Sequence, residues 1–242
     1  MTTLRKRLFP ILLIEGNRLI KTKKFSNPRY LGDPLNALRI FNEKCADEIL
    51  IIDKTNSPKP NLEILNRMVN EAFMPLSYIG NINSISDFED IFSLGIEKAG
   101  VNRMLKNNPA LVNDAASRWG KSSIFGCVDI VKHSNDYRIF FNNKVDTLTC
   151  ISDYFKRVSE INIGEIIIQN VSQEGTELGL DSKLINEAKK FFSVPLISTG
   201  GCSSINHAID HIKFNNISGV AAGSIFSFFG KKRAVLINYD YK

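Results

Sequence analysis

Short runs of β-branched and other apolar residues alternate with amphipathic segments along the whole chain. This alternation predicts an α/β fold in which helices cover a parallel sheet. Eight strand and helix units in a chain of 242 residues favour a closed (β/α)₈ TIM barrel. The predicted strands are Leu8–Ile14, Glu48–Asp53, Leu76–Gly80, Lys98–Val101, Ser123–Asp129, Glu165–Asn170, Pro195–Thr199 and Gly219–Ala222. The helical patterns between them are Pro34–Ala46, Asn61–Phe73, Ser84–Leu94, Pro109–Arg118, Thr147–Ile161, Ser182–Phe192 and Ser204–Phe214.

An internal repeat supports the barrel. Residues 75–85 match residues 195–205 at an offset of 120, with Pro, Leu, Gly, Ser and Ile in common. Residues 1–242 are therefore expected to form one domain built from two similar half-barrels, about 1–120 and 121–242. An open, doubly wound sheet is the alternative. It predicts a G-x-G-x-x-G motif after the first strand, and the segment Glu15–Asn17 does not supply one.

Composition excludes several classes of protein. With 43% hydrophobic residues and a net charge of +6, the chain has an ordinary globular composition. No apolar run is long enough to span a bilayer, and the short apolar stretch near the N-terminus reads better as a buried strand than as a signal peptide. A cytoplasmic protein is expected. The basic residues are scattered apart from two clusters, 21–24 and 231–233, so a small anionic ligand is favoured over nucleic acid.

Metal binding has little support in the sequence. The four cysteines, Cys45, Cys127, Cys150 and Cys202, lie far apart and are expected to be free thiols. Two histidines, His207 and His211, are four residues apart on a predicted helix, but no third ligand lies nearby. No metal and no organic cofactor are expected.

Functional residues of such a barrel are expected at the C-terminal ends of its strands. Glycine-rich strand ends can offer backbone N–H groups to phosphate, or can simply permit tight turns. They form two pseudo-symmetric sets, namely Gly200, Gly201, Gly223 and Ser224 in one half and Gly80, Asn81 and Asn102 in the other. Acid or base candidates are Asp129, Asp53 and Glu174, any of which could instead be a structural acceptor. Glu15 is expected to be one position out of phase with the barrel interior.

Several segments resemble the cyclase subunit of imidazole glycerol phosphate synthase, a phosphate-binding barrel that receives ammonia from a separate glutaminase. The similarity extends over residues 5–230. The matching segments are Arg7–Pro10, Arg18–Lys21, Asp47–Asp53, Asn108–Pro109, Glu174–Thr176, Ser198–Gly201 and Ala222–Ser224. The resemblance implies a heterodimer with a glutaminase subunit and a phosphorylated small-molecule substrate.

The resemblance also assigns roles to individual residues. Of the two catalytic aspartates of that family, one corresponds to Asp129 and the other to Leu13, which cannot transfer a proton. Loss of such a group lowers a rate about 10²–10⁴-fold, so standard cyclase chemistry is in doubt. The charged ring that gates ammonia entry is present in full as Arg7, Glu48, Lys98 and Glu165. A salt-bridge network that only stabilises the barrel base is the alternative interpretation of these four residues.

Other departures concern substrate handling and the chain end. A family Gly-Gly-Gly reads Ile79-Gly80-Asn81, and Ser172 replaces an aspartate. The segment 231–239 replaces the final amphipathic helix and looks like the ending of paralogues that help to amidate surface-polysaccharide sugars.

Three hypotheses follow. The first is an ammonia-conducting subunit of a glutamine amidotransferase complex that serves sugar amidation, with the glutaminase on the N-terminal face near Glu97. The second is a working cyclase that forms imidazole glycerol phosphate and AICAR from PRFAR and ammonia, with Glu15 replacing Leu13. The third is a phosphate-binding scaffold without ammonia transfer.

Overall fold

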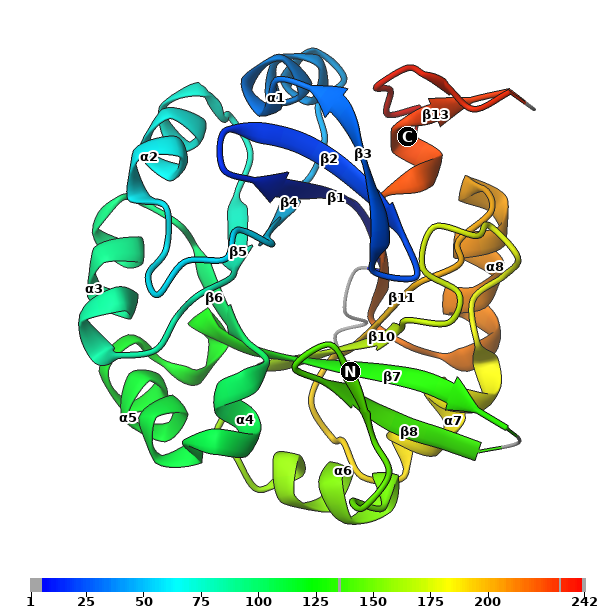
Figure 1. The fold of residues 1–242 in the computed structure, drawn as a ribbon. Helices are drawn as coiled ribbons and strands as arrows, with labels where there is room; N and C mark the ends of the chain where they lie inside the picture. The colour runs from blue at the N-terminus through cyan, green and yellow to red at the C-terminus, as the bar shows by residue number, and fades with distance from the viewer. Residues whose placement is uncertain (1–5, 135, 231, 241–242) are drawn as a thin grey trace.

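Eight parallel strands close into a barrel in the computed structural model, which describes residues 6–134, 136–230 and 232–240. Each strand pairs with its neighbours in chain order, and β7 pairs in parallel with β10. The barrel is seen end-on in Figure 1. The predicted (β/α)₈ fold is thereby confirmed. The barrel strands are β1 (Arg7–Glu15), β4 (Ile49–Asp53), β5 (Leu76–Ile79), β6 (Lys98–Val101), β7 (Ile124–His133), β10 (Glu165–Asn170), β11 (Leu196–Thr199) and β12 (Gly219–Ala222).

Helices form a ring outside the barrel (Figure 1). Most begin at a side chain that accepts a hydrogen bond from a backbone N–H of the first turn, such as Asp33, Asn108 and Ser204. Ser84 and Asp87 form a reciprocal capping box. The helices are α1 (Pro34–Glu43), α2 (Leu62–Glu71), α3 (Ile85–Ser93), α4 (Arg103–Asn107), α5 (Pro109–Trp119), α6 (Ile151–Ser159), α7 (Ser182–Lys189) and α8 (Ile205–Asn215).

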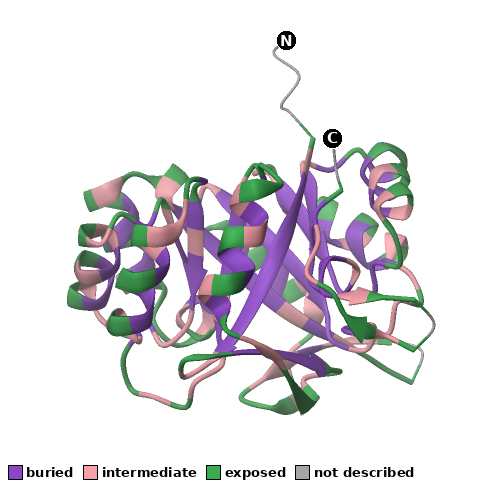
Figure 2. Ribbon diagram, turned by 90° about the horizontal axis from the view of Figure 1, so that it is seen from above, coloured by how far each residue is buried: buried purple, intermediate pink, exposed green. Residues whose placement is uncertain are grey.

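Alternation along the strands divides the apolar residues between two cores. On β1, Phe9 and Ile11 point into the barrel, whereas Leu8, Leu12 and Ile14 pack against the helices. Figure 2 shows the resulting continuous burial of the strands. Because β1 is buried on both faces, it reads in the sequence as an unbroken apolar run.

Two β-hairpins above the barrel were not expected from the sequence. β1 continues into β2 (Arg18–Lys23) and β3 (Ser26–Gly32), and β7 continues into β8 (Asp136–Phe141) and β9 (Lys144–Asp146). The two hairpins contact each other through aromatic side chains. The ring centroids of Phe25, between β2 and β3, and Phe140, on β8, are 5.8 Å apart. The expected division into two half-barrels remains a prediction, although a hairpin follows the first strand of each proposed half.

Some predicted boundaries were wrong for local reasons. α6 begins at Ile151 and not at Thr147, because the Asp146 carboxylate accepts hydrogen bonds from the backbone N–H groups of Leu148 and Thr149 and holds a turn there. Ser123 belongs to a short 3₁₀ turn, η1 (Lys121–Ser123), that precedes β7.

In the described part of the chain, no α-helix follows β12, the last barrel strand. β12 is followed by a 3₁₀ turn, η2 (Ser224–Phe226), and a small hairpin of β13 (Phe228–Phe229) and β14 (Ala234–Val235). Tyr239 is then 2% exposed, and its Oη donates to the Leu8 carbonyl at 3.2 Å. Lys231 and residues 1–5 lie outside the described residues, and no described helix has the length and apolar character needed to cross a membrane.

Candidate functional site

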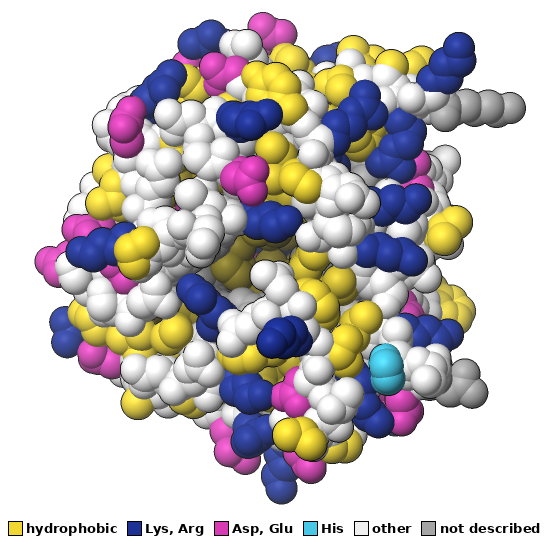
Figure 3. All heavy atoms as spheres, viewed as in Figure 1, with side chains coloured by type: hydrophobic (Ala, Val, Ile, Leu, Met, Phe, Trp, Pro, Cys, Tyr) yellow, Lys and Arg dark blue, Asp and Glu magenta, His cyan; other side chains and the backbone are white. Residues whose placement is uncertain are grey.

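A cavity of about 640 Å³ opens at the C-terminal ends of the barrel strands. Figure 3 shows the hollow in the middle of this face, with many Lys and Arg side chains around it. Its walls include residues from the ends of all eight barrel strands and from both hairpins. Phe25 and Phe140 contribute to its outer wall. This is the end of the barrel at which the sequence predicted functional residues.

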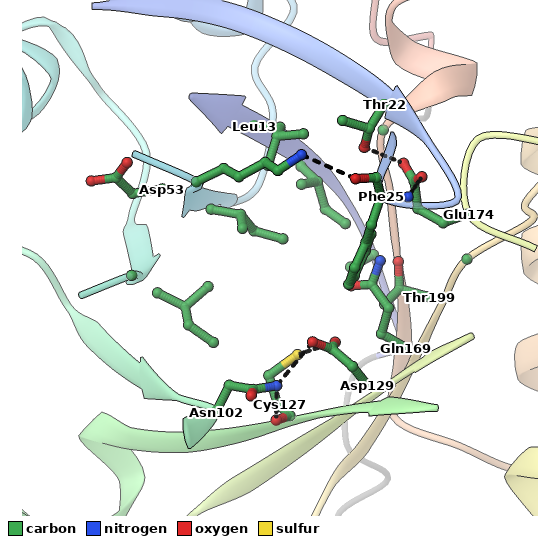
Figure 4. A pocket seen from close by; sticks show the side chains of 18 of the residues that line it. Leu13, Thr22, Phe25, Asp53, Asn102, Cys127, Asp129, Gln169, Glu174 and Thr199 are labelled. Atoms are coloured by element: carbon green, nitrogen blue, oxygen red, sulfur yellow. Dashed lines mark hydrogen bonds between the residues drawn. The ribbon is translucent and has the colours of Figure 1, made fainter. Parts of the chain in front are cut away.

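Asp129 points into this cavity from β7 (Figure 4). Asn102 Nδ2 donates to its Oδ2 at 3.0 Å, and Cys127 Sγ lies 3.9 Å from its Oδ1. Burial raises the pKa of Asp129 to about 7, although the hydrogen bonds from Cys127 and Asn102 act in the opposite direction. Near neutral pH this carboxyl group can therefore accept or donate a proton.

Leu13 occupies the position on β1 where the resemblance implies a second aspartate. Its side chain is 9% exposed and contributes to the cavity wall together with Ile11 and Ile52. Glu15 follows two residues later on the same face of β1, and it also lines the cavity. The prediction that Glu15 would be out of phase was wrong, because residues two apart on a strand share a face.

Asp53 and Glu174, the other acid or base candidates, are engaged in the structure. Asp53 lies on the opposite face of β4 from Ile52, and it accepts hydrogen bonds from Tyr78 Oη at 3.0 Å and from the Thr55 N–H at 2.8 Å. Glu174 accepts hydrogen bonds from the first hairpin. Its donors are Thr22 Oγ1 and the Phe25 N–H, each at 3.1 Å, and Lys21 Nζ lies 3.4 Å from Oε1. Both carboxylates hold neighbouring segments in place, so the structure favours a positioning role for each.

The glycine-rich end formed by β11 and β12 is shaped for close approach to the backbone. Gly200 and Gly201 have φ angles of +95° and +98°. A Cβ on Gly201 would lie 2.1 Å from the Gly179 carbonyl oxygen. Lys21 adds a buried ammonium group, because its Nζ would lie 2.4 Å from a Cβ on Gly223. Exposed backbone and a cation together suit a phosphate group.

The pseudo-symmetric end formed by β5 and β6 differs. Asn81, with φ +54°, donates from Nδ2 to the Thr55 carbonyl at 2.9 Å. Asn102 donates to Asp129 and to the Cys127 carbonyl. Gly80 permits a tight turn at φ +156°, where a Cβ would lie 2.6 Å from Asp53 Cβ. At this end the turn interpretation therefore accounts for Gly80, and both asparagine amides are already occupied.

Four charged side chains meet at the opposite, N-terminal end of the barrel. Arg7 donates to Glu48 at 2.5 and 2.9 Å and also binds Glu165. Lys98 Nζ lies 3.6 Å from Glu165 Oε2. Burial lowers the pKa of Arg7, but its two carboxylate partners raise it by more, so the guanidinium stays charged. We call these four residues the basal ion network.

His207 and His211, which the sequence analysis weighed as metal ligands and did not favour, both lie on α8. The ring centroids of His207 and His211 are 6.3 Å apart, and Asn215 Nδ2 lies 3.2 Å from His211 Nδ1. In the described part of the chain, no three His, Cys, Asp or Glu side chains are grouped as metal ligands. Cys45 and Cys150 are exposed free thiols, whereas Cys127 and Cys202 are buried free thiols.

Comparison with known proteins assigns this chain to a family. The family model described as histidine biosynthesis protein matches residues 7–232. The chain belongs to the histidine biosynthesis protein family. Membership confirms the resemblance drawn from the matching segments, such as Ser198–Gly201 and Ala222–Ser224.

Similar members of the histidine biosynthesis family cover nearly the full chain. A protein of Leptospira borgpetersenii, provisionally named imidazole glycerol phosphate synthase subunit HisF, is 38% identical over 242 residues, covering 98% of this chain and 95% of the relative. A Pseudomonas aeruginosa protein provisionally named subunit hisF2 is 37% identical over 240 residues, with 97% and 96% covered. Imidazole glycerol phosphate synthase subunit HisF of Bacillus cereus strain Q1 is 30% identical over 230 residues, with 93% and 91% covered.

Sequence reasoning missed several residues of the cavity. Lys21 was noted only within a basic cluster and a matching segment. Phe25 and Phe140 reach the cavity through the unexpected hairpins, and Arg103 lines it from the first position of α4. The pair Gly16-Asn17 between two apolar stretches was an available hairpin signal.

Proposed function

We propose that this chain is the synthase-like subunit of a cytoplasmic glutamine amidotransferase complex. It takes up ammonia from a glutaminase subunit at the N-terminal face of the barrel and passes it through the interior to the cavity. The observation that carries this proposal is the basal ion network, which lies at the N-terminal end of the barrel, opposite the cavity that Asp129 lines.

The charges of the network suit a gate for a neutral molecule. Two cations and two carboxylates balance, and Arg7 binds both carboxylates. The contact between Lys98 and Glu165, at 3.6 Å, is the longest of its ion pairs. Movement of Lys98 would therefore open the entrance while the pairs of Arg7 persist.

The barrel interior beyond the network is apolar. Phe9, Leu50, Phe125 and Ile197 form a buried cluster between the network and the cavity. A charged ammonium ion would lose its hydration in such a layer at a much higher free-energy cost than neutral ammonia. The layer therefore favours passage of ammonia over ammonium and over water-borne ions.

The N-terminal face also offers contacts for a glutaminase. Phe73, which precedes β5, is 89% exposed, and Phe214, at the end of α8 before β12, is 80% exposed. Exposed aromatic side chains are typical anchors of protein interfaces. Glu97 is exposed next to Lys98 and adds a charge beside the entrance.

For the use of the ammonia, we propose amidation of a surface-polysaccharide sugar. Leu13 removes one carboxylate from the acid and base pair of the cyclase reaction, which favours another acceptor. The choice of a polysaccharide sugar rests on the resemblance of the C-terminal segment to that of paralogues with this role.

The test is a glutaminase assay of the purified partner subunit with and without this chain, run beside a cyclase assay with PRFAR and ammonium. We expect stimulated glutaminase activity without cyclase turnover. Lys98→Met and Glu48→Gln should change the coupling of glutamine hydrolysis to ammonia delivery, whereas Lys59→Met, on an exposed loop, should not. A scaffold without ammonia transfer would show no response to any of these variants, and rapid cyclase turnover with free ammonia would contradict the proposal.

A second candidate is the cyclase activity itself. It is favoured by Asp129, with a pKa of about 7, and by Glu15, a carboxylate on the same cavity wall as Leu13. Under this reading the chain complements a histidine auxotroph, and both Asp129→Asn and Glu15→Gln abolish growth. Well-expressed wild-type protein that fails to complement would exclude it.

A further inference from the structure

We infer that the C-terminal hairpin docks this protein on an anionic lipid surface, with its basic residues at the lipid headgroups and its outer apolar face against the acyl chains. The hairpin consists of β13 and β14 and carries Lys232 and Arg233 between them. The inference goes beyond the proposed function and does not depend on ammonia conduction.

Positive charge is concentrated in two segments of the chain. Residues 16–32 hold five Lys and Arg, residues 226–239 hold three, and neither segment contains Asp or Glu. Without these eight cations, the 31 Lys and Arg of the chain would no longer outnumber its 25 Asp and Glu. The two segments contain the basic clusters 21–24 and 231–233 noted in the sequence.

The structure brings the two segments together beside the cavity. The Gly175 carbonyl accepts a hydrogen bond from Arg233 Nη1 at 3.1 Å, and a Cβ on Gly175 would lie 3.1 Å from Lys23 Cα. Arg29, on β3, donates to the Arg233 carbonyl at 3.2 Å. Figure 3 shows Lys and Arg side chains next to hydrophobic ones to the upper right of the hollow, where Figure 1 places β3 and β13.

One face of the C-terminal hairpin is held against the protein. The guanidinium carbons of Arg29 and Arg233 lie 5.3 and 4.4 Å from the centroid of the Phe228 ring. Arg233 also forms an ion pair with Glu177 at 3.1 Å. These contacts fix the orientation of the hairpin.

The other face of the hairpin is uncovered. Successive residues of a strand point to opposite faces, so Phe229 points away from the face that carries Phe228. Phe229 pairs with Ala234, and the Leu236 N–H continues the ladder by donating to the Ser227 carbonyl at 3.0 Å. Phe229 is 70% exposed and Leu236 is 50% exposed. An exposed apolar face of this kind indicates a surface that meets a partner.

The cations beside this face favour lipid as that partner. Lys23, Lys24 and Lys232 are exposed, and within the described residues none of them forms an ion pair. Apolar side chains bordered by Lys suit an anionic membrane, where cations contact headgroups and apolar groups enter the acyl boundary. Lys is depleted from protein interfaces, which disfavours an acidic protein. A second copy of the chain is disfavoured because two such surfaces would repel each other.

Docking through the hairpin would orient the barrel. The hairpin contacts Gly175 and Ser224, which both line the cavity. The cavity end would therefore lie nearer to the lipid than the basal ion network, and the N-terminal face would stay open to a protein partner.

Vesicle co-sedimentation of the purified full-length chain tests the inference. The probes are vesicles of phosphatidylcholine alone and of phosphatidylcholine and phosphatidylglycerol in equal parts. We expect binding to the anionic vesicles that weakens as salt is added, and little binding to the neutral ones. Binding to neither kind of vesicle, or equal binding to both, would overturn the inference.

A charge variant and its control test the role of the cations. Lys24→Gln combined with Lys232→Gln should weaken binding to anionic vesicles about 10- to 30-fold, because both cations lie at the proposed headgroup contact. Lys156→Gln combined with Lys213→Gln removes the same charge from the exposed surfaces of α6 and α8 and should bind as wild type does. Equal weakening by the two pairs would show a general charge effect and contradict docking through the hairpin.

Apolar variants test the contact with the acyl chains. Phe229→Ala and Leu236→Ala should each weaken binding to anionic vesicles about 5- to 10-fold, because each removes apolar area from the lipid. Leu148→Ala is the matched control, since Leu148 is 96% exposed just before α6, across the barrel from β13 (Figure 1), and should bind as wild type does. No loss for either hairpin variant would exclude insertion.

Soluble polyglutamate distinguishes a membrane from an acidic protein. We expect any binding of polyglutamate to depend on Lys24 and Lys232 and to be unaffected by Phe229→Ala. Polyglutamate that binds more tightly than the vesicles, and that loses affinity with Phe229→Ala, would overturn the inference in favour of an acidic protein. The glutaminase assay tests ammonia conduction separately from all of these outcomes.

Discussion

Replacement of Arg7 by methionine tests how much the basal ion network stabilises the barrel. Methionine keeps a flexible side chain next to Phe9, whose ring lies 5.0 Å from the guanidinium carbon. It leaves the carboxylates of Glu48 and Glu165 without their main partner. We therefore expect the free energy of unfolding to fall.

The expected loss follows from the burial of the network. Removal of one partner from a fully buried ion pair costs about 3–5 kcal/mol. The Arg7 side chain is 23% exposed, and Glu165 keeps Lys98 at 3.6 Å, so solvent and the remaining cation reduce the loss. We expect about 2–3 kcal/mol at pH 7, which with a urea dependence near 3 kcal/mol per M lowers the midpoint by about 1 M.

Urea unfolding followed by circular dichroism measures this change. Arg39→Met is the matched control, because Arg39 also donates two hydrogen bonds to one carboxylate, that of Glu71, at 2.9 and 3.1 Å, but on the exposed helical surface. Its effect should be much smaller than that of Arg7→Met. Equal midpoint shifts for the two variants would refute the argument that burial makes the basal network valuable.

Three further predictions concern the site and the chain end. The pKa of Asp129 is raised from 3.8 to about 7, so its contribution to the free energy of unfolding is fully present below pH 3.8, falls as the pH rises through 7, and is lost above that, by up to about 4 kcal/mol. In urea titrations, Asp129→Asn should therefore be more stable than wild type by about 2–4 kcal/mol at pH 8 and no more stable at pH 3.5. Gly201→Ala should lower the free energy of unfolding by about 2 kcal/mol, because the added Cβ would lie 2.1 Å from the Gly179 carbonyl oxygen. The variant should also bind the sugar phosphate fructose 6-phosphate more weakly, and an unchanged melting temperature would contradict this. Tyr239→Phe should lower the free energy of unfolding in urea by about 1 kcal/mol, because it loses the hydrogen bond to the Leu8 carbonyl. Tyr239→Ala also removes the buried ring and should lower it by about 3–5 kcal/mol; similar values for the two variants would show that ring packing is unimportant.

The barrel itself could be predicted because its signal is local and repeated. Strands such as Glu165–Asn170 and Lys98–Val101 were predicted with their observed bounds. Their apolar runs are bounded by turn residues, and the fold class then fixes which end carries the cavity. Asp129 could be found as a candidate because it closes such a run.

The remaining wall of the cavity depends on tertiary structure that the periodicity does not encode. Phe25, Lys21 and Phe140 reach the cavity only because two hairpins fold over the strand ends. The sequence marked Ile79-Gly80-Asn81 as a departure in the first half, but it could not show the cause, which is where the amides of Asn81 and Asn102 point. Side-chain hydrogen bonds between distant segments cannot be inferred from spacing alone.

On the predicted division of the chain at about residue 120, the charges of the basal ion network are shared unequally between the two half-barrels. If Leu13 and Asp129 are equivalent positions, the second-half counterpart of Arg7 is Ser123, and that of Lys98 is Gly219 by strand position. Glu48 and Glu165 correspond to each other, so each half carries one carboxylate while both cations come from the first. Two copies of the second half would bring unpaired carboxylates together, and two copies of the first would bring an excess of cations. Charge neutrality at the base is therefore reached only by unlike halves, which favours their association over self-pairing of either one.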